Sequence, residues 1–563
     1  MNRKQRRAQE KMAAKAVPGQ PAMDPARRAA LLEANRLNDQ ALDLHRAGKV
    51  AAALAALQQA IATFPDNPLY HNNLGELLRM SGDAAAALPH FDRAIALAPK
   101  YAAAHNNRGN ALRDLKRPAE AIAACQMAVE LQPDYAEAHN NTAAAMMDMR
   151  AFTSALEPLR RAIALNPNIA IFHQNLGLTL SSLGDMAEAE MAFAAAIRLD
   201  PGMIETQIAM GDLARGRGEF DEMLRWYGQA CRLKPGHGEA HLRYGAALMI
   251  KGDYSAAWPH FGARWTVETM ATDKRPFTLP FWQGEAIPPG GRMLLFTEQG
   301  VGEILALTSL VPELLARGIT PVMEVEPRLV PLFRRSFAGI EVLARETPAN
   351  PRLFEADLVV QASLFDLAAV FRHRPEDCTG ALPLRVDEAR TAALRARYRQ
   401  GQDMPLVGVA WYSGNREIGA PKSASLTALS PFLTLPGFRF VDLQYGNRAE
   451  DRAALKAAHG VDLLYDTEID QMQDLDGFAA QVAAMDMVIT TSNTTAHMAG
   501  ALGKPTWVML HKGISPHWYW GRDGETTPWY PTLHLLRQSV DGDWFTPALQ
   551  AAGELRRLVP AAA

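Results

Sequence analysis

The sequence predicts an α-helical repeat array followed by an α/β region, and two observations support this prediction. Prolines recur every 34 residues through the first half of the chain, at Pro65, Pro99, Pro133, Pro167, Pro201 and Pro235. Beyond residue 291, short apolar runs of strand type alternate with segments of helical type. A fixed period of this length indicates stacked helical units, and the alternation indicates parallel sheets covered by helices.

The composition is that of a globular protein with several domains. The 563 residues are 48% hydrophobic and 21% charged, with a net charge of -3. This balance gives no support for nucleic-acid binding. The three cysteines lie far apart and form no CxxC pair, so we expect neither a disulfide framework nor a metal site.

The N-terminus and the distribution of apolar residues bear on location. No apolar run approaches the roughly 20 residues that span a bilayer, and the basic start MNRKQRRAQEK lacks the apolar centre of a signal peptide. We expect a cytoplasmic protein without a membrane span, in which residues 1–33 form a basic, disordered tail and a lead-in helix.

Each 34-residue unit carries the same packing pattern. Small residues such as Gly75 and Gly109 let two helices approach closely, a large residue such as Phe91 fills the space between them, and the proline ends the second helix. We place about seven such units over residues 34–267. The pattern resembles the tetratricopeptide (TPR) family, which implies a superhelix of helix pairs that binds peptides or proteins.

Asparagines recur with the same period, in HNNLG, HNNRG, HNNTA and HQNLG. The series is Asn72, Asn73, Asn106, Asn107, Asn140, Asn141 and Asn175. Asparagine is a mediocre helix former and adds nothing to an apolar core, so we expect a polar partner at each position. One alternative is a contact between repeats inside the stack. The other, which we favour, is that carboxamides in the groove bind the backbone of a client protein, because each can both donate and accept a hydrogen bond. The series is similar to the asparagine ladder of O-linked N-acetylglucosamine transferases.

The second half of the chain predicts two Rossmann-like halves that face a cleft. Residues 268–291 contain four prolines within a non-periodic stretch and predict a linker. The strands RMLLFTEQ, TPVMEVE and ADLVVQA assign residues 292–400 to the first half, with one helix over residues 303–318 after the first strand. The strands PLVGVAWYSG, FRFVDLQYG, MDMVITTSN and PTWVML assign residues 401–563 to the second half.

Loops that follow the strands carry the candidate site residues, because ligands bind at the carboxyl ends of parallel strands. In TTSNTTAH, hydroxyls and free backbone N–H groups at a helix start predict an anion site, with an ordinary helix cap as the alternative. The residues concerned are Ser492, Asn493, Thr494 and Thr495.

Two further loops contribute charged residues. The turn in TEQGVGE places Glu303 at the start of a helix. The loop WYSGNREIGAPKSAS brings Ser413, Arg416 and Lys422 to the mouth of the second sheet, with ordinary surface charge as the alternative.

The stretch SNTTAHMAGALGKPTWVML resembles the heptosyltransferase-like glycosyltransferases of the GT-B fold, in the branch fused to TPR repeats. The resemblance covers about residues 276–560. It implies that the phosphates of a nucleotide-sugar donor bind at Asn493, Thr494, Thr495 and His497, assisted by Lys422. It also implies a general base after the first strand, where relatives have aspartate and this chain has Glu303.

The candidate site loops have no metal-ligand cluster or DxD pair, so we expect a transferase that requires no divalent ion and no cofactor besides its nucleotide-sugar co-substrate. The resemblance implies that it is inverting. For this domain layout it implies a protein O-glycosyltransferase acting on Ser or Thr of a client recruited by the repeats. Flagellin is a candidate client and a nonulosonic acid a candidate sugar. The alternatives are a non-catalytic scaffold with a decayed GT-B domain, or a transferase that acts on lipopolysaccharide.

Overall fold

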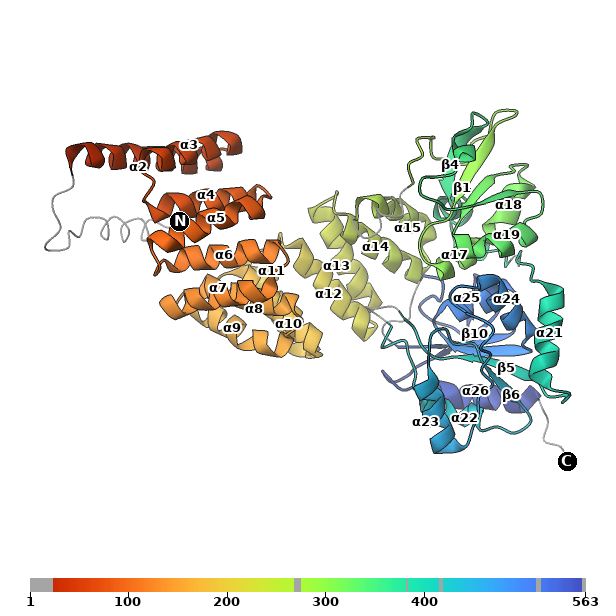
Figure 1. Ribbon diagram of the computed structural model, residues 1–563. Helices are drawn as coiled ribbons and strands as arrows, with labels where there is room; N and C mark the ends of the chain where they lie inside the picture. Colours follow the sequence, from red (N-terminus) through yellow and green to blue (C-terminus); the bar gives the residue numbers. More distant parts are fainter. Residues whose placement is uncertain (1–23, 268–274, 381–382, 415–418, 513–517, 559–563) are drawn as a thin grey trace. The chain divides into compact units, whose positions relative to one another are not determined.

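The computed structural model describes residues 24–267, 275–380, 383–414, 419–512 and 518–558. The chain divides into two compact units, residues 1–206 and 207–563. The division falls within the repeat array (Figure 1), so the last repeats belong to the same unit as the α/β region.

Seven helix pairs make up the array in the part of the chain that the structure describes. The first five pairs are α2 (Pro25–Arg46) with α3 (Val50–Thr63), α4 (Pro68–Met80) with α5 (Ala84–Leu97), α6 (Ala102–Asp114) with α7 (Pro118–Leu131), α8 (Ala136–Asp148) with α9 (Phe152–Leu165), and α10 (Ala170–Leu183) with α11 (Met186–Leu199). The last two are α12 (Ile204–Arg217) with α13 (Phe220–Leu233), and α14 (Gly238–Lys251) with α15 (Tyr254–Phe261).

The helices of a pair pack closely because glycine stands at the point of contact. A Cβ added at Gly75 would lie 2.8 Å from the ring of Phe91, and one at Gly109 would lie 2.3 Å from Sγ of Cys125. No other residue fits there without displacing its neighbour. Cys125 is fully buried, and burial raises the pKa of its thiol to about 12, which suits a packing residue.

The first half of the α/β region is built on a four-stranded parallel sheet with the order β3-β2-β1-β4. The strands are β1 (Arg292–Phe296), β2 (Val322–Val325), β3 (Glu341–Ala344) and β4 (Leu358–Ser363). The helices are α17 (Val301–Leu307), α18 (Leu310–Ala316), α19 (Val330–Ser336) and α20 (Leu364–Phe371). Short 3₁₀ turns, η1 (Gly262–Thr266) among them, link the array to this sheet and lie between its elements.

The second half contains a six-stranded sheet with the order β6-β5-β7-β8-β10-β9, parallel except for β9. The strands are β5 (Leu406–Ala410), β6 (Arg439–Asp442), β7 (Met487–Thr491), β8 (Thr506–Leu510), β9 (Thr526–Thr527) and β10 (Tyr530–Arg537). The helices are α21 (Glu388–Arg399), α22 (Ser430–Leu433), α23 (Ala449–His459), α24 (Leu475–Ala484), α25 (Thr494–Ala501) and α26 (Phe545–Leu558).

The elements differ from the sequence prediction in two respects. The single helix expected over residues 303–318 is two short helices, α17 and α18, because Pro312 has no N–H to donate to the carbonyl of Thr308. The strands β3, β9 and β10 had not been predicted. The edge strand β3 is short, and its half-exposed residues gave a weak apolar signal.

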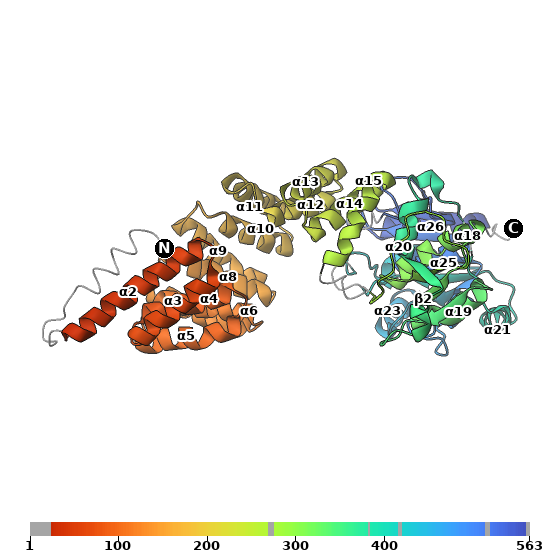
Figure 2. The same cartoon turned by 90° about the horizontal axis from the view of Figure 1, so that it is seen from above.

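The last repeat packs directly on the α/β region of its own unit. The indole N–H of Trp258 donates to the carbonyl of Arg372, the backbone N–H of Ser255 donates to the carbonyl of His373 at 3.1 Å, and Trp529 donates to the Tyr254 hydroxyl at 3.2 Å. Figures 1 and 2 both show α15, the last helix of the array, beside the α/β region. The repeat end and the sheets therefore share one core.

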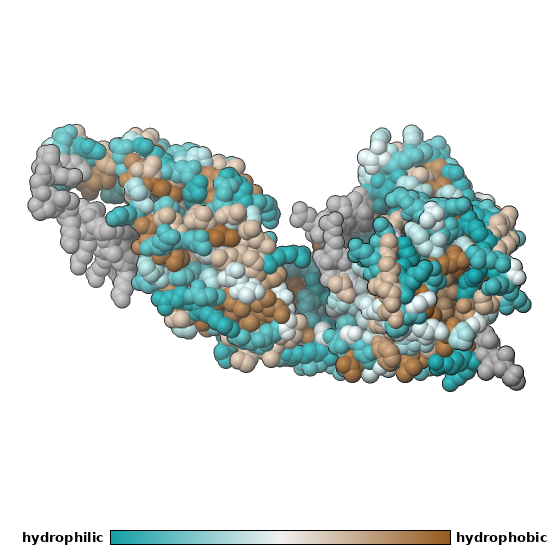
Figure 3. All heavy atoms as spheres, turned by 60° about the horizontal axis from the view of Figure 1, so that its bottom comes forward, coloured by the Kyte–Doolittle hydropathy of each residue, from teal (hydrophilic) through white to brown (hydrophobic). Residues whose placement is uncertain are grey.

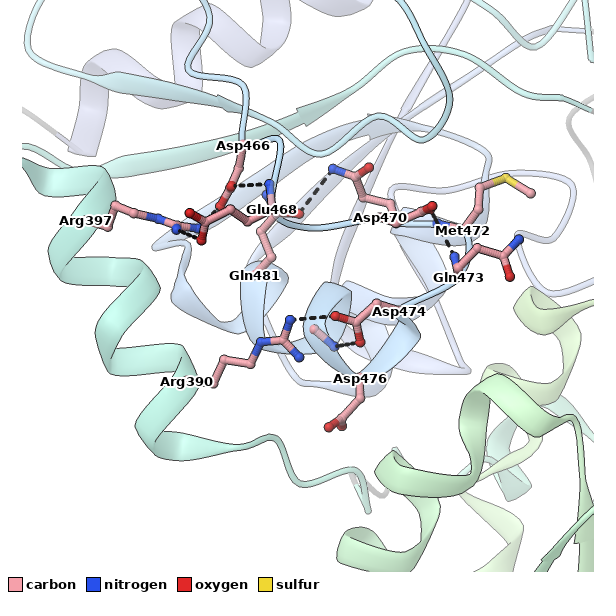
Figure 4. Close-up of polar contacts among 12 residues, drawn as sticks. Arg390, Arg397, Asp466, Glu468, Asp470, Met472, Gln473, Asp474, Asp476 and Gln481 are labelled. Carbon is pink, nitrogen blue, oxygen red and sulfur yellow. Dashed lines mark hydrogen bonds and ion pairs between the residues drawn. The ribbon is translucent and has the colours of Figure 1, made fainter.

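Helix α21 joins the two halves and lies along the second. Figure 4 shows Arg390 and Arg397 reaching from α21 to the acidic segment that precedes α24. Arg390 pairs with Asp474 at 2.5 Å, and Arg397 pairs with Asp466 and Glu468. These ion pairs fix the helix that carries the chain from one sheet to the other.

The visible surface is mixed in polarity. On the face shown in Figure 3, apolar residues are scattered among polar ones. Among the described helices, none is both long enough and apolar enough to cross a membrane.

Candidate functional site

Both sheets have a point where the strand order reverses, and the predicted site loops follow the strands at these points. In the first sheet the reversal lies between β1 and β4, and in the second it lies between β5 and β7. Ligands of open α/β sheets bind outside the carboxyl ends of such strands. Glu303 lies in the first turn of the helix after β1, Lys422 in the loop after β5, and Thr495 in the first turn of the helix after β7.

The switch point of the first sheet is filled by an arginine from the end of the repeat array. Arg264, in η1, makes two 2.9 Å bonds to the carboxylate of Glu298 after β1 and one 2.9 Å bond to Asp366 after β4. Arg264 and Glu298 are both buried. This cluster anchors the repeat to the sheet and leaves the next acidic residue, Glu303, to face the second half.

Glu303 lies in the first turn of α17, which packs against α25 of the second half. Its Oε2 lies 2.8 Å from the position that a Cβ would take at Gly300, so only glycine permits this conformation. Burial raises the pKa of the Glu303 carboxyl, while its own backbone N–H and the charge of Lys422 lower it. A carboxyl poised in this way is suited to accept a proton.

Lys422 lies on the loop after β5 and is buried. Burial lowers the pKa of its ammonium to about 8; Glu303 opposes this shift, and the charge of Arg215 from α12 adds to it. The charges of Lys422, Arg215 and Glu303 therefore act on one another at this site. A bound anion would relieve the repulsion between the cations.

The loop after β7 forms the N-terminus of α25, as predicted, but it uses two of its side chains internally. Asn493 caps the helix by accepting the N–H of Thr495 at 3.0 Å, and it donates to the carbonyl of Tyr412 at 3.3 Å. Ser492 accepts the indole N–H of Trp520 at 2.8 Å.

Two hydroxyls that flank this loop, one at the end of β7 and one in the first turn of α25, are buried without a partner among the described residues. Oγ1 of Thr491 and Oγ1 of Thr495 have no hydrogen bond within the described ranges. A buried hydroxyl left in this state is costly unless a ligand meets it. Together with the positive end of the α25 helix dipole, these hydroxyls make the start of α25 a candidate anion site.

His497 lies inside an aromatic cage. Its Nδ1 lies 2.9 Å from the Tyr530 hydroxyl, and its ring stacks on Trp520 with centroids 5.1 Å apart. On the other side, a Cβ at Gly302 would come within 2.8 Å of the imidazole, so glycine allows α17 and α25 to meet. Burial lowers the pKa of His497 to about 3, so the ring is neutral and contributes no positive charge to a phosphate.

The charge of Lys422 acts on both Glu303 and His497, and α17 packs against α25, which also carries Thr495. We call Glu303, Lys422, Thr495 and His497 the inter-sheet cluster. Thr494 is half-exposed at the first turn of α25. The backbone N–H of Ser413 donates to Oγ of Ser423 at 3.0 Å. The prediction for Arg416 lies outside the described residues.

The asparagines of the array form a ladder of hydrogen bonds from repeat to repeat. Nδ2 of Asn73 donates to Oδ1 of Asn38 at 2.8 Å, and Nδ2 of Asn107 donates to Oδ1 of Asn72 at 3.0 Å. The next rungs are Asn141 to Asn106 at 2.9 Å and Asn175 to Asn140 at 2.8 Å. The contact inside the stack, left open by the sequence, is therefore present. It explains why asparagine recurs without a ligand, whereas the predicted client-binding role stays a prediction.

The ladder ends at a definite position. Gln174 stands where the earlier repeats have the accepting asparagine, and its buried Oε1 has no partner among the described residues. The sequence places Ala209 where the next donating asparagine would stand.

The histidine of each HNN motif also has an internal role. Nε2 of His71, His105 and His139 lies 3.0 Å from the carbonyl of the proline six residues earlier, and His173 repeats the contact at 2.8 Å. The periodic proline thus supplies the acceptor for the next helix pair. The 34-residue spacing of both residues was the signal that could have predicted this bond.

Sequence reasoning missed the aromatic cage and the contribution of the array to the cluster. Tyr519, Trp520 and Tyr530 surround His497, and the aromatic run WYW at residues 518–520 was the available signal. Arg264 and Arg215 stand in the repeats, and no local pattern connects them to a sheet edge far along the chain.

Comparisons with known proteins identify the repeats. Family models described as tetratricopeptide repeat match residues 38–102, 102–135 and 143–204. The chain therefore carries TPR repeats, which suggest a peptide or protein partner.

Protein FlbA of Caulobacter vibrioides is 31% identical over 333 residues, which are 55% of this chain and 53% of FlbA. The match thus spans about half the length of this curated relative.

The solved structures that resemble the chain include TPR proteins. PilF of Pseudomonas aeruginosa is 20% identical and covers 39% of this chain and 96% of its own, with a TM-score of 0.34. YrrB, described as a TPR protein with an unusual peptide-binding site, is 23% identical and covers 33% and 95%, with a TM-score of 0.28. PilW, described as a type IV pilus biogenesis factor, is 22% identical and covers 37% and 96%, with a TM-score of 0.35.

Proposed function

We propose that the protein is a glycosyltransferase of the GT-B type that transfers a sugar from a nucleotide-sugar donor to a Ser or Thr hydroxyl of a client protein. The observation that carries the proposal is the inter-sheet cluster. It sets a carboxyl of raised pKa, Glu303, near a buried ammonium, Lys422. The N-terminus of α25 adds the Thr495 hydroxyl, which lacks a partner among the described residues.

Each group has a part in the proposed displacement. The client hydroxyl oxygen attacks the anomeric carbon of the sugar and gives its proton to the Glu303 carboxylate. The bond from this carbon to the phosphate oxygen breaks, and the electron pair leaves with the phosphate. Lys422 and the N-terminus of α25 stabilise the negative charge that develops there. The neutral ring of His497 sets the spacing between α17 and α25.

The repeats have the proposed role of holding the client. The donating asparagines of the ladder, Asn73, Asn107, Asn141 and Asn175, are only half-buried. Each uses one amide hydrogen for the rung to the preceding repeat. The second hydrogen is free to bind a carbonyl of a client backbone, which requires no particular client sequence. Flagellin is the first client to test.

A specific observation favours a second candidate, a scaffold that binds clients without transferring sugar. Ser492 and Asn493 of the anion loop are both used in internal hydrogen bonds. A loop that serves only the fold would look the same in these two positions. The unpartnered hydroxyls of Thr491 and Thr495 weigh against this candidate.

The experiment is intact-mass analysis of candidate clients after incubation with the protein and a panel of nucleotide sugars. A mass gain equal to one sugar residue is expected with the wild type and is lost in Glu303→Gln, which keeps the shape but cannot accept the proton. The control is Glu355→Gln, an exposed glutamate of the same half. No mass gain with any client and donor, or an unchanged gain in Glu303→Gln, would overturn the proposed chemistry.

A further inference from the structure

Three metal-ligating side chains converge in the last repeats, one from each of three successive helices. They are Cys231 on α13, His241 on α14 and His260 on α15. Their ligand atoms all lie within 4.8 Å of one another. Sulfur and imidazole nitrogen are the ligands preferred by Zn²⁺ and similar borderline-soft ions. None of the three residues has a part in the proposed sugar transfer.

The geometry fixes the ring of His241 with a nitrogen lone pair facing the other two residues. Its Nε2 lies 2.8 Å from the carbonyl of Pro235, which can only accept, so this nitrogen carries the hydrogen. Its Nδ1 therefore presents a lone pair, 2.7 Å from Nδ1 of His260. Metal-ligating histidines commonly donate their second ring N–H to a backbone carbonyl in this way.

The sequence at the matching positions of the other repeats shows that the combination is particular to this place. The position of Cys231 holds an aliphatic residue in the five preceding repeats, namely Ile61, Ile95, Val129, Ile163 and Ile197. The position of His260 holds alanine in three of them. A packing role alone would be served by the same aliphatic residue again.

One earlier repeat offers a natural reference that lacks the thiol. His71 and His90 form the equivalent imidazole pair, with their Nδ1 atoms 3.4 Å apart, and Ile61 stands in place of the cysteine. The last repeats differ from it by the addition of sulfur and by a closer approach of the two rings.

We propose that Cys231, His241 and His260 bind a divalent ion of the zinc type. Bonds of about 2.3 Å to sulfur and about 2.0–2.1 Å to nitrogen require ligand atoms roughly 3.3–3.6 Å apart around a tetrahedral ion. The two rings must separate slightly from their present contact, and the sulfur must move inward. Water fills the fourth position.

Binding involves two proton movements. The Cys231 thiol loses its proton to solvent as the sulfur–metal bond forms. His260, which donates its Nδ1 hydrogen to His241 in the metal-free state, changes to the tautomer that carries the hydrogen on Nε2.

A bound ion would cross-link the helices that attach the array to the α/β region. Helix α15 carries Tyr254 and Trp258, which bond to Trp529 and to the carbonyl of Arg372. Joining α13 and α14 to this helix stiffens the attachment, because an ion that binds only the folded arrangement stabilises it.

The test is a titration of the full-length, tag-free, chelator-stripped protein with Co²⁺, followed by displacement with Zn²⁺. We expect one equivalent to produce a thiolate-to-cobalt charge-transfer band, which Zn²⁺ removes, and a higher melting temperature with Zn²⁺. Cys231→Ile and His260→Ala introduce the residues found at these positions in other repeats and should keep the metal-free melting temperature. Both should lose the band.

The matched control is His90→Ala, which dismantles the pair without a thiol and should leave the band unchanged. A wild type that shows no thiolate band at one equivalent, or a Cys231→Ile variant that keeps the full cobalt affinity and Zn²⁺ stabilisation, would overturn the proposal.

Discussion

The asparagine ladder of the first unit and the inter-sheet cluster of the second use buried polar groups in opposite ways. In the ladder, Nδ2 of each donating asparagine bonds to Oδ1 in the preceding repeat. In the cluster, the hydroxyl of Thr495 is unsatisfied within the described chain, and the pKa values of Glu303 and Lys422 are displaced by burial. Buried polar groups whose hydrogen bonds are satisfied indicate a structural role. Buried groups with a shifted pKa or an unsatisfied hydrogen bond indicate a ligand site.

The largest effect should come from the charge pair that joins the array to the first sheet. Arg264→Ala leaves Glu298 buried without its cation, and breaking such a pair costs about 3–5 kcal/mol. We expect this loss in chemical denaturation of the second unit's transition. Arg93→Ala removes an exposed ion pair and should cost at most about 1 kcal/mol. Equal effects of the two changes would show that the buried cluster is not the anchor.

The next effect tests whether the ladder is structural. Asn107→Ala leaves Oδ1 of the buried Asn72 without its donor, which costs about 1–3 kcal/mol. Asn110→Ala, a half-exposed position outside the ladder, should be nearly neutral. Denaturation curves measure both. If the two variants unfold alike, the rungs add nothing to stability.

A further set of changes tests whether the asparagine ladder also binds a client. Replacing Asn73, Asn107, Asn141 and Asn175 by alanine should weaken a client's binding while leaving nucleotide affinity unchanged. Fluorescence anisotropy with a labelled client measures the first, at a temperature where the variant remains folded. Unchanged client affinity would show that these asparagines serve only the hydrogen bonds between repeats.

The pH dependence of nucleotide binding tests the cluster. Lys422 binds a phosphate only when protonated, and its pKa in the free protein is about 8. Binding therefore takes up a proton above this pH, and affinity should fall by about tenfold for each further pH unit. Lys422→Met should bind weakly at every pH with a flat profile. A wild-type profile that is also flat from pH 7 to 9 would remove Lys422 from the site.

The smallest effect concerns the array's own contribution to the cluster. Arg215→Ala removes a distant positive charge and should weaken nucleotide binding a few-fold at low salt, less at high salt. Arg113 occupies the equivalent position of an earlier repeat and pairs with Asp148. Arg113→Ala should leave nucleotide affinity unaltered. An equal effect of both changes would show that the charge of Arg215 does not contribute to nucleotide binding.

The array was predictable from sequence because the same packing contact recurs in each repeat. Gly75 and Phe91 reveal their contact through the matching pairs of the other repeats, and the strands β1, β5 and β7 were evident from apolar runs. The partner of the asparagines was not predictable. A rung joins residues 35 positions apart, and a period alone does not say whether a carboxamide faces its neighbour or a ligand.

The cluster was predictable only in part, for a related reason. Glu303, Lys422 and Thr495 each stand in a segment that follows a strand, and the rule that ligands bind at the carboxyl ends of parallel strands placed them at sheet edges. Which loops meet depends on how the two sheets pack, and that is decided by close contacts such as Gly302 against His497. The ion pairs of Arg264, which anchor the array to the first sheet, were not predictable either, because a linker separates Arg264 from that sheet in the sequence.

The most direct test of the central claim is calorimetric titration with nucleoside diphosphates and CMP at pH 7. We expect at least one of them to bind the wild type and also Lys504→Met, which changes a lysine that donates to a backbone carbonyl in the same half. Lys422→Met should bind about tenfold to a hundredfold more weakly, since a hydrogen bond to a charged group contributes about 1.5–3 kcal/mol. Absence of binding to the wild type, or equal affinity in Lys422→Met, would contradict the assignment of the inter-sheet cluster to a nucleotide-sugar donor.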